Sequence, residues 1–199
     1  MANFCNNTFS ISHDDPIMID RFEKAFNSTG VFQEFIPMPA GLKGSVAPCR
    51  DEAVKASNIK MYGAPDWYNW KIDNWGNKWD ASSRDGDYGS VERDSDKLNG
   101  WFISAWSPPI QAFLKLGELG FTYELTYDES GHAFIGTISW DGQTLRDDCY
   151  SFDFEQYKKE GLDWRNEIPE EFHDAVDQYY EEWLEMQGDD EDVKVETDH

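Results

Sequence analysis

The sequence lacks the cysteine pattern that a disulfide framework or a structural zinc site requires. Its three cysteines, Cys5, Cys49 and Cys149, are widely spaced, odd in number and without a Cys-x-x-Cys pair. The chain also has no run of about 18 apolar residues, and its N-terminal residues do not form a charged-then-apolar leader. These absences argue against export and membrane insertion, so we expect a cytoplasmic protein, in a compartment where thiols stay reduced.

Basic residues are scarce. The chain has 40 Asp and Glu against 17 Lys and Arg, a net charge of −23, and residues 160–199 alone hold 16 acidic residues but only Arg165 and Lys194 as basic ones. Proteins bind nucleic acid by neutralising phosphates with Lys and Arg, so direct nucleic-acid binding is not expected. A negative field gathered at one end instead favours encounter with an oppositely charged surface. The expected partner is the basic surface of a protein.

Sequence motifs of common catalytic and phosphate-binding sites are absent as well. Neither the GxxxxGK[ST] loop nor the GxGxxG loop occurs, and no nucleophile elbow or HExxH pair is found. Paired carboxylates can act as acid and base, but in a chain with 40 acidic residues such pairs carry little information. We therefore predict a protein without enzymatic activity and assign no catalytic residue, metal or cofactor.

Three short aspartate clusters leave a metal-dependent enzyme open as an alternative. Asp85-Gly86-Asp87, Asp94-Ser95-Asp96 and Asp147-Asp148 contain carboxylates of the kind that hold Ca²⁺ or Mg²⁺. None of them completes an EF-hand loop, because Leu98 stands at the next alternate position after Asp96. Aspartates in such positions also cap turns by bonding to their own backbone, which is the simpler explanation.

What the chain has in abundance is aromatic residues. Nine Trp, nine Tyr and 13 Phe supply the apolar surface of a folded core, although the mean hydropathy is −0.73. Four tryptophans fall within the 13 residues Trp67–Trp79, where exposed indoles could stack on bases or sugars. A stacking platform normally lies in a cationic groove, whereas here Lys78 has Asp80 as its expected partner. We therefore predict a local core with mostly buried Trp75, Trp79 and Trp106.

Alternating and helical spacings predict the elements of the first part of the chain. Asn3–Ser12 alternates with Cys5, Asn7, Phe9 and Ile11 on one side, which predicts a strand with that side buried. A helix is predicted from Pro16 to a stop at Gly30, because its apolar residues recur at near-helical spacing. Val31–Ile36 is predicted as a second strand. Residues 40–99 show little periodicity and are interpreted as a tryptophan-rich insertion.

Regular patterns return after the insertion. They predict a strand, a helix, a hairpin and a last strand, over Trp101–Trp106, Ile110–Leu119, Phe121–Tyr127 with Ala133–Trp140, and Leu145–Phe152. Strand, helix and strand, twice in succession, is the ferredoxin-like split βαββαβ plan of an α+β protein. We therefore predict a ferredoxin-like domain over residues 1–152, with the insertion at about 40–99.

Four segments within residues 1–140 carry a family resemblance: Met1–Asn7, Asn74–Ala81, Ala105–Pro109 and the hairpin from Tyr127–Glu129 to Phe134–Gly136. They resemble the YubB-type ferredoxin-like-domain proteins of phages and conjugative plasmids, with Phe4 in place of a usual Trp and Asn77 in place of a usual Thr. The resemblance implies the same fold and an accessory protein of a mobile genetic element. The family has no established catalytic residues, so the resemblance implies no mechanism.

The clearest helix lies outside this resemblance, between Pro169 and Gly188. Its apolar residues form one stripe, which predicts packing against the domain in an acidic helical extension of residues 153–188. Its other faces carry seven acidic residues: Glu170, Glu171, Asp174, Asp177, Glu181, Glu182 and Glu185. Like charges four residues apart, such as Asp177 and Glu181, repel each other, and no Lys or Arg is interleaved. Residues 189–199 are predicted to form a disordered acidic tail.

These seven carboxylates are the predicted partner-binding residues. An ordinary exposed helix face mixes charges of both signs, so a face of one sign favours a basic partner. The leading hypothesis is a phage or mobile-element protein that inhibits a host nucleic-acid-handling defence system, such as a nuclease or a CRISPR effector. It would act as a DNA mimic in the basic channel of that protein. The alternatives are a scaffold or regulator that binds a host protein through the tryptophan-rich surface, the metal-dependent enzyme, and an acidic surface typical of a halophilic background.

Overall fold

The computed structural model describes residues 3–83 and 88–195, with side chains up to residue 187. The chain divides into two compact units. The first unit comprises Met1–Glu129 and Gly136–Asp148, and the second comprises Ser130–Ile135 and Cys149–His199. Within the described residues, no helix combines the length and the apolar character that crossing a membrane requires.

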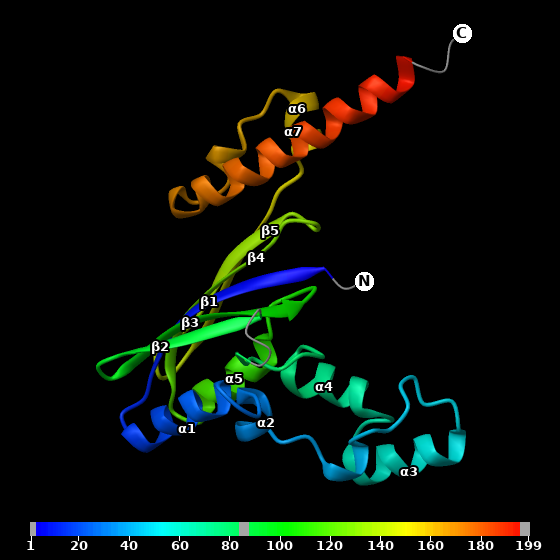
Figure 1. Ribbon diagram of the computed structural model, residues 1–199, viewed down its shortest axis with the longest axis vertical. Coiled ribbons are helices and arrows are strands. Elements are labelled where there is room, and N and C mark those ends of the chain that lie inside the picture. The colour runs from blue at the N-terminus through cyan, green and yellow to red at the C-terminus, as the bar shows by residue number, and fades with distance from the viewer. Residues whose placement is uncertain (1–2, 84–87, 196–199) are drawn as a thin grey trace. The chain divides into compact units, whose positions relative to one another are not determined.

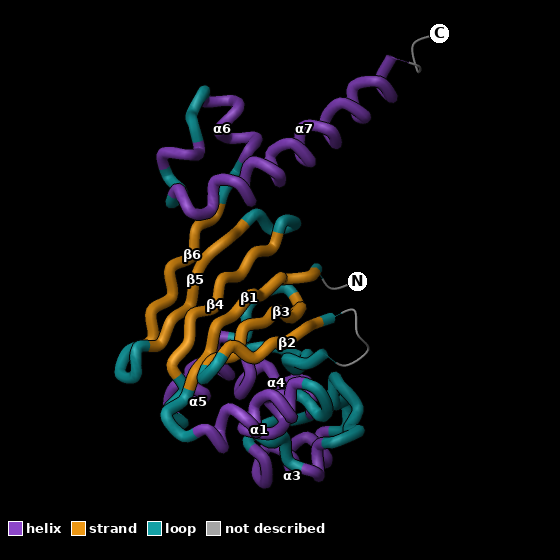
Figure 2. The backbone as a smooth tube through the Cα atoms, turned by 60° about the vertical axis from the view of Figure 1, so that its left-hand side comes forward, coloured by secondary structure: helices purple, strands orange, loops and turns teal. Residues whose placement is uncertain are grey.

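The strands form one six-stranded sheet in the order β2-β3-β1-β4-β5-β6 (Figure 2). Their bounds are β1 Phe4–Ser12, β2 Gly89–Asp94, β3 Lys97–Ala105, β4 Thr122–Glu129, β5 Phe134–Trp140 and β6 Leu145–Ser151. Strand β1 pairs antiparallel with both β3 and β4, so that Thr8 lies opposite Trp101 on one side and Thr126 on the other. The predicted α+β class is confirmed, as are the strands expected after the insertion.

One face of the sheet in the first unit is covered by helices. Strand β1 buries its odd-numbered residues, including Cys5 and Phe9, as the alternation predicts. Helices α1 (Pro16–Phe26) and α5 (Ile110–Glu118) lie on this side (Figure 1). The ring centroids of Phe9 and Phe22 are 5.8 Å apart, and those of Phe102 and Phe113 are 6.2 Å apart. This aromatic core joins α1 and α5 to the central strands.

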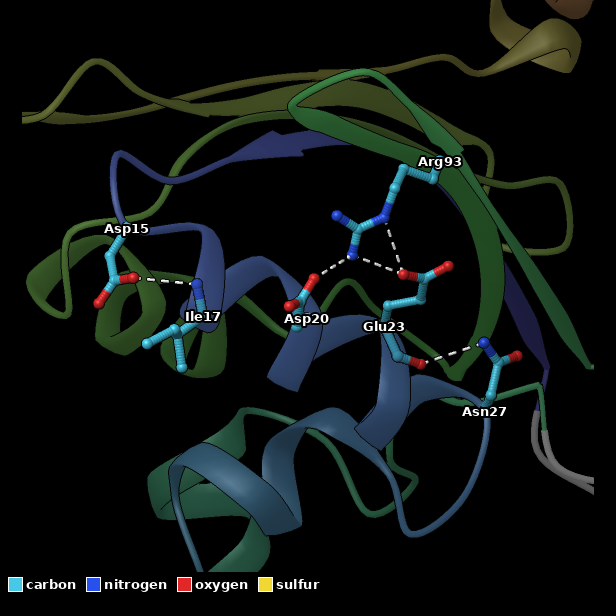
Figure 3. Close-up of polar contacts among 6 residues, drawn as sticks. All are labelled: Asp15, Ile17, Asp20, Glu23, Asn27 and Arg93. Atoms are coloured by element: carbon cyan, nitrogen blue, oxygen red, sulfur yellow. Dashed lines mark hydrogen bonds and ion pairs between the residues drawn. The ribbon is translucent and has the colours of Figure 1, made fainter.

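Helix α1 begins where the sequence predicts it. The Asp15 carboxylate accepts a hydrogen bond of 2.9 Å from the backbone N–H of Ile17, and Pro16 occupies the first turn (Figure 3). The helix buries Ile19, Phe22 and other apolar residues on one side. Local capping and local periodicity agree in this segment, so its sequence suffices to define the helix.

The predicted strand Val31–Ile36 is wrong: this segment forms the short helix α2 (Val31–Phe35). The reason is a cap from a distant part of the chain. The Asp80 carboxylate accepts hydrogen bonds from the backbone N–H groups of Phe32, at 2.7 Å, and Gln33, at 2.9 Å. Gly30 has a φ of 101°, and a Cβ there would lie 2.3 Å from the Asp80 carboxyl carbon. Glycine therefore makes room for the cap.

Residues 40–99 are more regular than the sequence predicts. They contain a short 3₁₀ turn, η1 (Ala40–Leu42), helices α3 (Glu52–Tyr62) and α4 (Trp67–Trp75), strand β2 and the start of β3. Asp51 and Asp66 cap the two α-helices at their N-termini, and Gly63 and Gly76 end them in the left-handed conformation. Several apolar side chains of α3 stay exposed, so this helix lacks the buried stripe that would reveal it.

The second unit has a core of its own. Helix α6 (Phe154–Glu160), the 3₁₀ turns η2 (Trp164–Asn166) and η3 (Glu170–Phe172), and helix α7 (His173–Val195) follow one another along the chain. Their buried side chains form one cluster with the preceding strand segments: Ile135, Phe152, Phe154, Tyr157, Trp164, Ile168, Phe172 and Val176. The clustered residues come from every element of this unit, so α7 is held by packing.

The last helix differs from its predicted bounds at both ends. Its first residues Glu170–Phe172 form the 3₁₀ turn η3, and α7 then continues past Gly188 to Val195. A glycine inside a helix costs roughly 0.5–1 kcal/mol relative to alanine, which weakens a helix without ending it. Residues 189–195 of the predicted disordered tail are therefore helical, and residues 196–199 lie outside the described part of the chain.

Candidate functional site

The predicted partner-binding residues lie in two successive elements of the second unit. Glu170 and Glu171 are exposed on the 3₁₀ turn η3. The other five form the acidic face of α7: Asp174, Asp177, Glu181, Glu182 and Glu185. Four of these five are exposed, and Asp177 is half-buried.

The apolar stripe of α7 explains why these carboxylates face outward. Phe172 and Val176 are buried in the core of the second unit, and Tyr179, Tyr180 and Trp183 pack against that core. The ring centroid of Tyr180 lies 5.1 Å from that of Phe154 in α6. Because the side chains of a helix advance by about 100° per residue, the residues between these contacts project to the opposite side. The acidic face is therefore the outer side of a packed helix.

Four carboxylates of the acidic face follow one line along α7. Asp174, Asp177, Glu181 and Glu185 are spaced by three, four and four residues, the spacing of neighbours on one side of a helix. Asp174 and Glu185 are separated by about 16 Å along the axis. With Glu182, five carboxylates fall within this length, at a mean spacing of about 4.1 Å along the axis, compared with 3.4 Å between phosphates along one DNA strand.

Two carboxylates of the acidic face have partners within the chain. The Arg165 side chain, from η2, forms an ion pair with Asp177 and lies 3.6 Å from Asp163. No Lys or Arg is interleaved among the carboxylates of the acidic face, but the repulsion at Asp177 is relieved from outside the helix, because the chain folds η2 back beside this residue. Gln178 donates a hydrogen bond of 3.0 Å to Glu182. Among the described residues, no ion pair reaches the remaining carboxylates of the acidic face, which are Asp174, Glu181 and Glu185.

The predicted tryptophan core is only partly confirmed. Trp75 is buried, and its indole N–H donates to the Ile36 carbonyl at 2.9 Å. Trp79 is half-buried, and Trp106 is 36% exposed, so its predicted burial is wrong. Lys78 does not pair with Asp80. Its ammonium lies 4.1 Å from the ring centroid of Trp106 and 5.2 Å from that of Trp79, where the rings shield it on two sides.

Phe4 and Trp101 are exposed aromatic residues that the sequence argument missed. They are 47% and 40% exposed on the side of β1 and β3 that the helices leave open. A signal for Phe4 was present in the sequence: it falls on the polar side of the alternation in Asn3–Ser12, opposite the side predicted to be buried.

The most perturbed carboxyl group of the insertion has a structural role. Burial raises the pKa of Asp80 to about 6, although the N–H groups of Phe32 and Gln33 and the nearby Lys71 oppose this shift. Burial also lowers the pKa of Lys71, whose ammonium donates to the Lys78 carbonyl at 3.2 Å. Because the oxygens of Asp80 already accept hydrogen bonds at the N-terminus of α2, this group serves the fold.

The aspartate clusters do not assemble into a metal site in the part of the chain that the structure describes. There, no three side chains among His, Cys, Asp and Glu come together to hold an ion. Asp94 is the last residue of β2, Asp96 lies in the turn before β3, and Asp147 accepts a hydrogen bond of 2.8 Å from the Tyr127 hydroxyl. Asp85 and Asp87 lie outside the described residues.

A pocket of about 550 Å³ lies beside the β2–β3 turn, and Arg93 is its most basic group. The Arg93 guanidinium donates at 2.8 Å to Asp20 and at 2.6 Å to Glu23 (Figure 3). These hydrogen bonds raise the pKa of Arg93, with Glu23 as the larger cause. Two carboxylates thus neutralise the cation, and Asp14 and Asp96 line the same pocket. The pocket is therefore not suited to anions such as phosphate.

Comparisons with family models and with curated proteins give no match to the chain. Among solved structures, the chain is similar to the crystal structure of protein api92 from Yersinia pseudotuberculosis, which carries the family model DUF1281. The TM-score is 0.47 at 9% identity, over 77% of this chain and 99% of that chain.

Proposed function

We propose that this protein is a non-enzymatic inhibitor that binds the basic, nucleic-acid-binding surface of a host protein through the acidic face of α7. One observation carries the proposal. Asp174, Glu181 and Glu185 are exposed along one side of a helix whose opposite side is packed, and no ion pair within the described residues reaches them. A fixed row of unpaired carboxylates is suited to Lys and Arg side chains of another protein.

The energetics of α7 support a role outside folding. Like charges four residues apart destabilise a helix by roughly 0.2–0.5 kcal/mol per pair, and Asp177, Glu181 and Glu185 form two such pairs. Arg165 offsets this repulsion only at Asp177. A face that costs stability is consistent with selection for binding, since a mixed surface would avoid the cost.

The proposed mechanism is competition for cations. Lys and Arg side chains in a nucleic-acid channel would form charge-assisted hydrogen bonds with the carboxylates in place of phosphates. Because α7 is packed along its inner side, few degrees of freedom are lost when it docks. A carboxylate row offers no phosphodiester bond, so a nuclease would be blocked without turning over its inhibitor.

The family context stays part of the proposal. We infer a ferredoxin-like core, which is supported by the position of β3 between β1 and β2 and by α1 and α5 following β1 and β3 in the chain. The resemblance of residues 1–140 to YubB-type proteins suggests a phage or plasmid accessory protein in the host cytosol. A defence nuclease or a CRISPR effector is the proposed target, because such proteins carry basic channels.

The proposal is tested by reversing charge on the acidic face. The triple variant Asp174→Lys, Glu181→Lys and Glu185→Lys should lose at least about 100-fold in affinity for a partner recovered from host lysate, because each buried charge contact is worth about 1.5 kcal/mol or more. Wild-type binding should weaken with salt and compete with a 30-base-pair duplex for the partner.

A second triple variant serves as the matched control. Asp14→Lys, Asp73→Lys and Glu155→Lys change the net charge equally at exposed positions away from the acidic face. If both triple variants lose the same affinity, net charge alone drives binding. If neither does, the acidic face is not the binding site.

A further inference from the structure

All four aromatic side chains that are at least 36% exposed among the described residues gather in the first unit. They are Phe4 and Tyr88, each 47% exposed, Trp101 at 40% and Trp106 at 36%. Together with the half-buried Trp79 we name them the aromatic face. Scattered exposed apolar residues are normal on proteins, whereas a contiguous set indicates an interaction surface.

Ring contacts join Phe4, Trp79 and Tyr88, and strand pairing brings Trp101 near Tyr88. Helices α1 and α5 lie on one side of the sheet (Figure 1). Phe4 and Trp101 are at exposed positions in the burial alternation of β1 and β3, on the other side. The Phe4 ring centroid lies 5.8 Å from that of Trp79 and 6.4 Å from that of Tyr88. The Tyr88 carbonyl accepts a hydrogen bond of 3.0 Å from Ile103, two residues after Trp101, which brings Tyr88 within reach of that indole.

The strained backbone of Trp106 helps to keep its side chain exposed at the surface. Its φ is 66°, in the left-handed region that bulky residues rarely adopt. The backbone N–H of Trp106 donates to the Asn3 carbonyl at 3.0 Å, which anchors this conformation. Strain of this kind persists where function requires it, and here it holds an indole that packing does not bury.

The aromatic face already binds a cation within the chain. The Lys78 ammonium lies over the rings of Trp106 and Trp79, at 4.1 and 5.2 Å from their centroids. In the described residues, no Lys or Arg lies over the rings of Phe4, Tyr88 or Trp101. Two of the five rings of the aromatic face thus hold a cation, and the other three present the same chemistry to an external cation.

Charges on the same side of the sheet favour an external cation too. Glu92 on β2 and Glu124 on β4 are exposed. The strand register pairs Glu92 with Asn99 and Glu124 with Ser10, on the same side of the sheet as Trp101. A platform for single-stranded nucleic acid would need a cationic groove, whereas Lys78 is already held by two indoles. Charge complementarity therefore points to a basic partner.

We propose that the aromatic face is a second docking surface, which binds an arginine-bearing segment of a basic protein with a guanidinium stacked on Trp101. Arginine fits better than lysine, because its planar group stacks on aromatic rings and is more weakly hydrated. Aromatic residues and arginine are also the residues enriched at interface hot spots. This surface lies in the first unit and does not depend on the role proposed for α7.

The test uses the full chain and three labelled probes: a 12-residue Arg-Gly repeat peptide, the matching Lys-Gly peptide, and oligo(dT) of about 12 nucleotides. Fluorescence anisotropy at physiological salt should show tighter binding of the Arg peptide than of the Lys peptide. Trp101→Ala and Tyr88→Ser should each weaken the Arg peptide about two- to fivefold, as expected for loss of one cation–π contact. Trp101→Phe should recover most of this loss.

Controls separate this surface from folding and from α7. Ile17→Ala, at an apolar position 64% exposed on α1, should leave Arg-peptide binding unchanged. Asp174→Gln, Glu181→Gln and Glu185→Gln together should keep the preference for Arg over Lys. Circular dichroism monitors the folding of each variant. Equal affinity for the two peptides, unchanged binding by Trp101→Ala, or tighter binding of oligo(dT) would each overturn the proposal.

Discussion

The carboxylates of the first unit and those of the acidic face differ in what they contact. In the first unit, Asp66 caps a helix, and Asp20 and Glu23 hold Arg93. On α7, Glu181 and Glu185 have no ion pair within the described residues. The first set is used by the fold, whereas the second adds repulsion to it. This comparison is the basis for the proposal that the charge on α7 serves binding to another molecule.

The aromatic residues also divide into those that the fold uses and those that stay exposed. The largest expected effect on stability concerns them. Trp75 is buried, so Trp75→Ala should lower the free energy of unfolding by about 3–5 kcal/mol. Trp106→Gly should change it by no more than about 1 kcal/mol, because relief of the left-handed strain offsets the lost contacts. Urea unfolding followed by circular dichroism measures both. A loss for Trp106→Gly as large as that for Trp75→Ala would make Trp106 a core residue.

The pH dependence of stability tests the structural role of Asp80. Its folded pKa of about 6 lies above the ordinary value of 3.8 for an aspartate, so its contribution to stability is fully present below about pH 4 and is lost as pH rises through 6. Relative to Asp80→Asn, the wild type should therefore gain up to about 3 kcal/mol between pH 7 and pH 4. Parallel unfolding curves at the two pH values measure the difference. A constant difference would show that burial does not shift this carboxyl group.

The contrast between used and unused carboxylates is sharpened by a pair of alanine substitutions. Asp66 is buried and accepts hydrogen bonds of 3.0 Å from the N–H groups of Asn69 and Cys49. Asp66→Ala should cost about 2 kcal/mol, because the cap is lost and the Cys49 N–H loses its acceptor. Asp66→Asn keeps an acceptor oxygen and should cost less. A neutral Asp66→Ala variant in thermal unfolding would remove the contrast with α7.

The smallest expected effect on stability lies on the acidic face itself. Glu181→Ala should raise the free energy of unfolding by a few tenths of a kcal/mol, because it removes repulsion by Asp177 and Glu185 and improves helix propensity. Thermal unfolding at low salt measures the gain, which should shrink at high salt as the charges are screened. A destabilised Glu181→Ala variant would mean that this carboxylate has a partner in the fold.

The parts of the fold that the sequence predicted are those with local signals. Strand β1 shows its alternation, and α1 has its own cap in Asp15. Helix α2 was mistaken for a strand, because its cap, Asp80, is 48 residues from Phe32. Helix α3 lacks a buried stripe and was missed for that reason.

For the candidate site too, the sequence predicted only what local signals show. The acidic residues and the apolar stripe of α7 could be found from composition and spacing, because both are local properties of one helix. The ion pair of Asp177 could not be found in this way, because Arg165 reaches Asp177 from a separate turn. The exposure of Trp106 also escaped the sequence argument, because a tryptophan count does not tell a core ring from one that holds Lys78 at the surface.

By itself, the sequence determined the α+β class, the elements with strong periodicity and the concentration of negative charge near the C-terminus. Only the tertiary structure decided which carboxylates are paired, which indoles are exposed and where the helices of the insertion begin. The physical reason is the separation along the chain of the residues that produce each property. Periodicity and net charge belong to neighbouring residues, whereas caps, ion pairs and burial arise between residues that folding brings together.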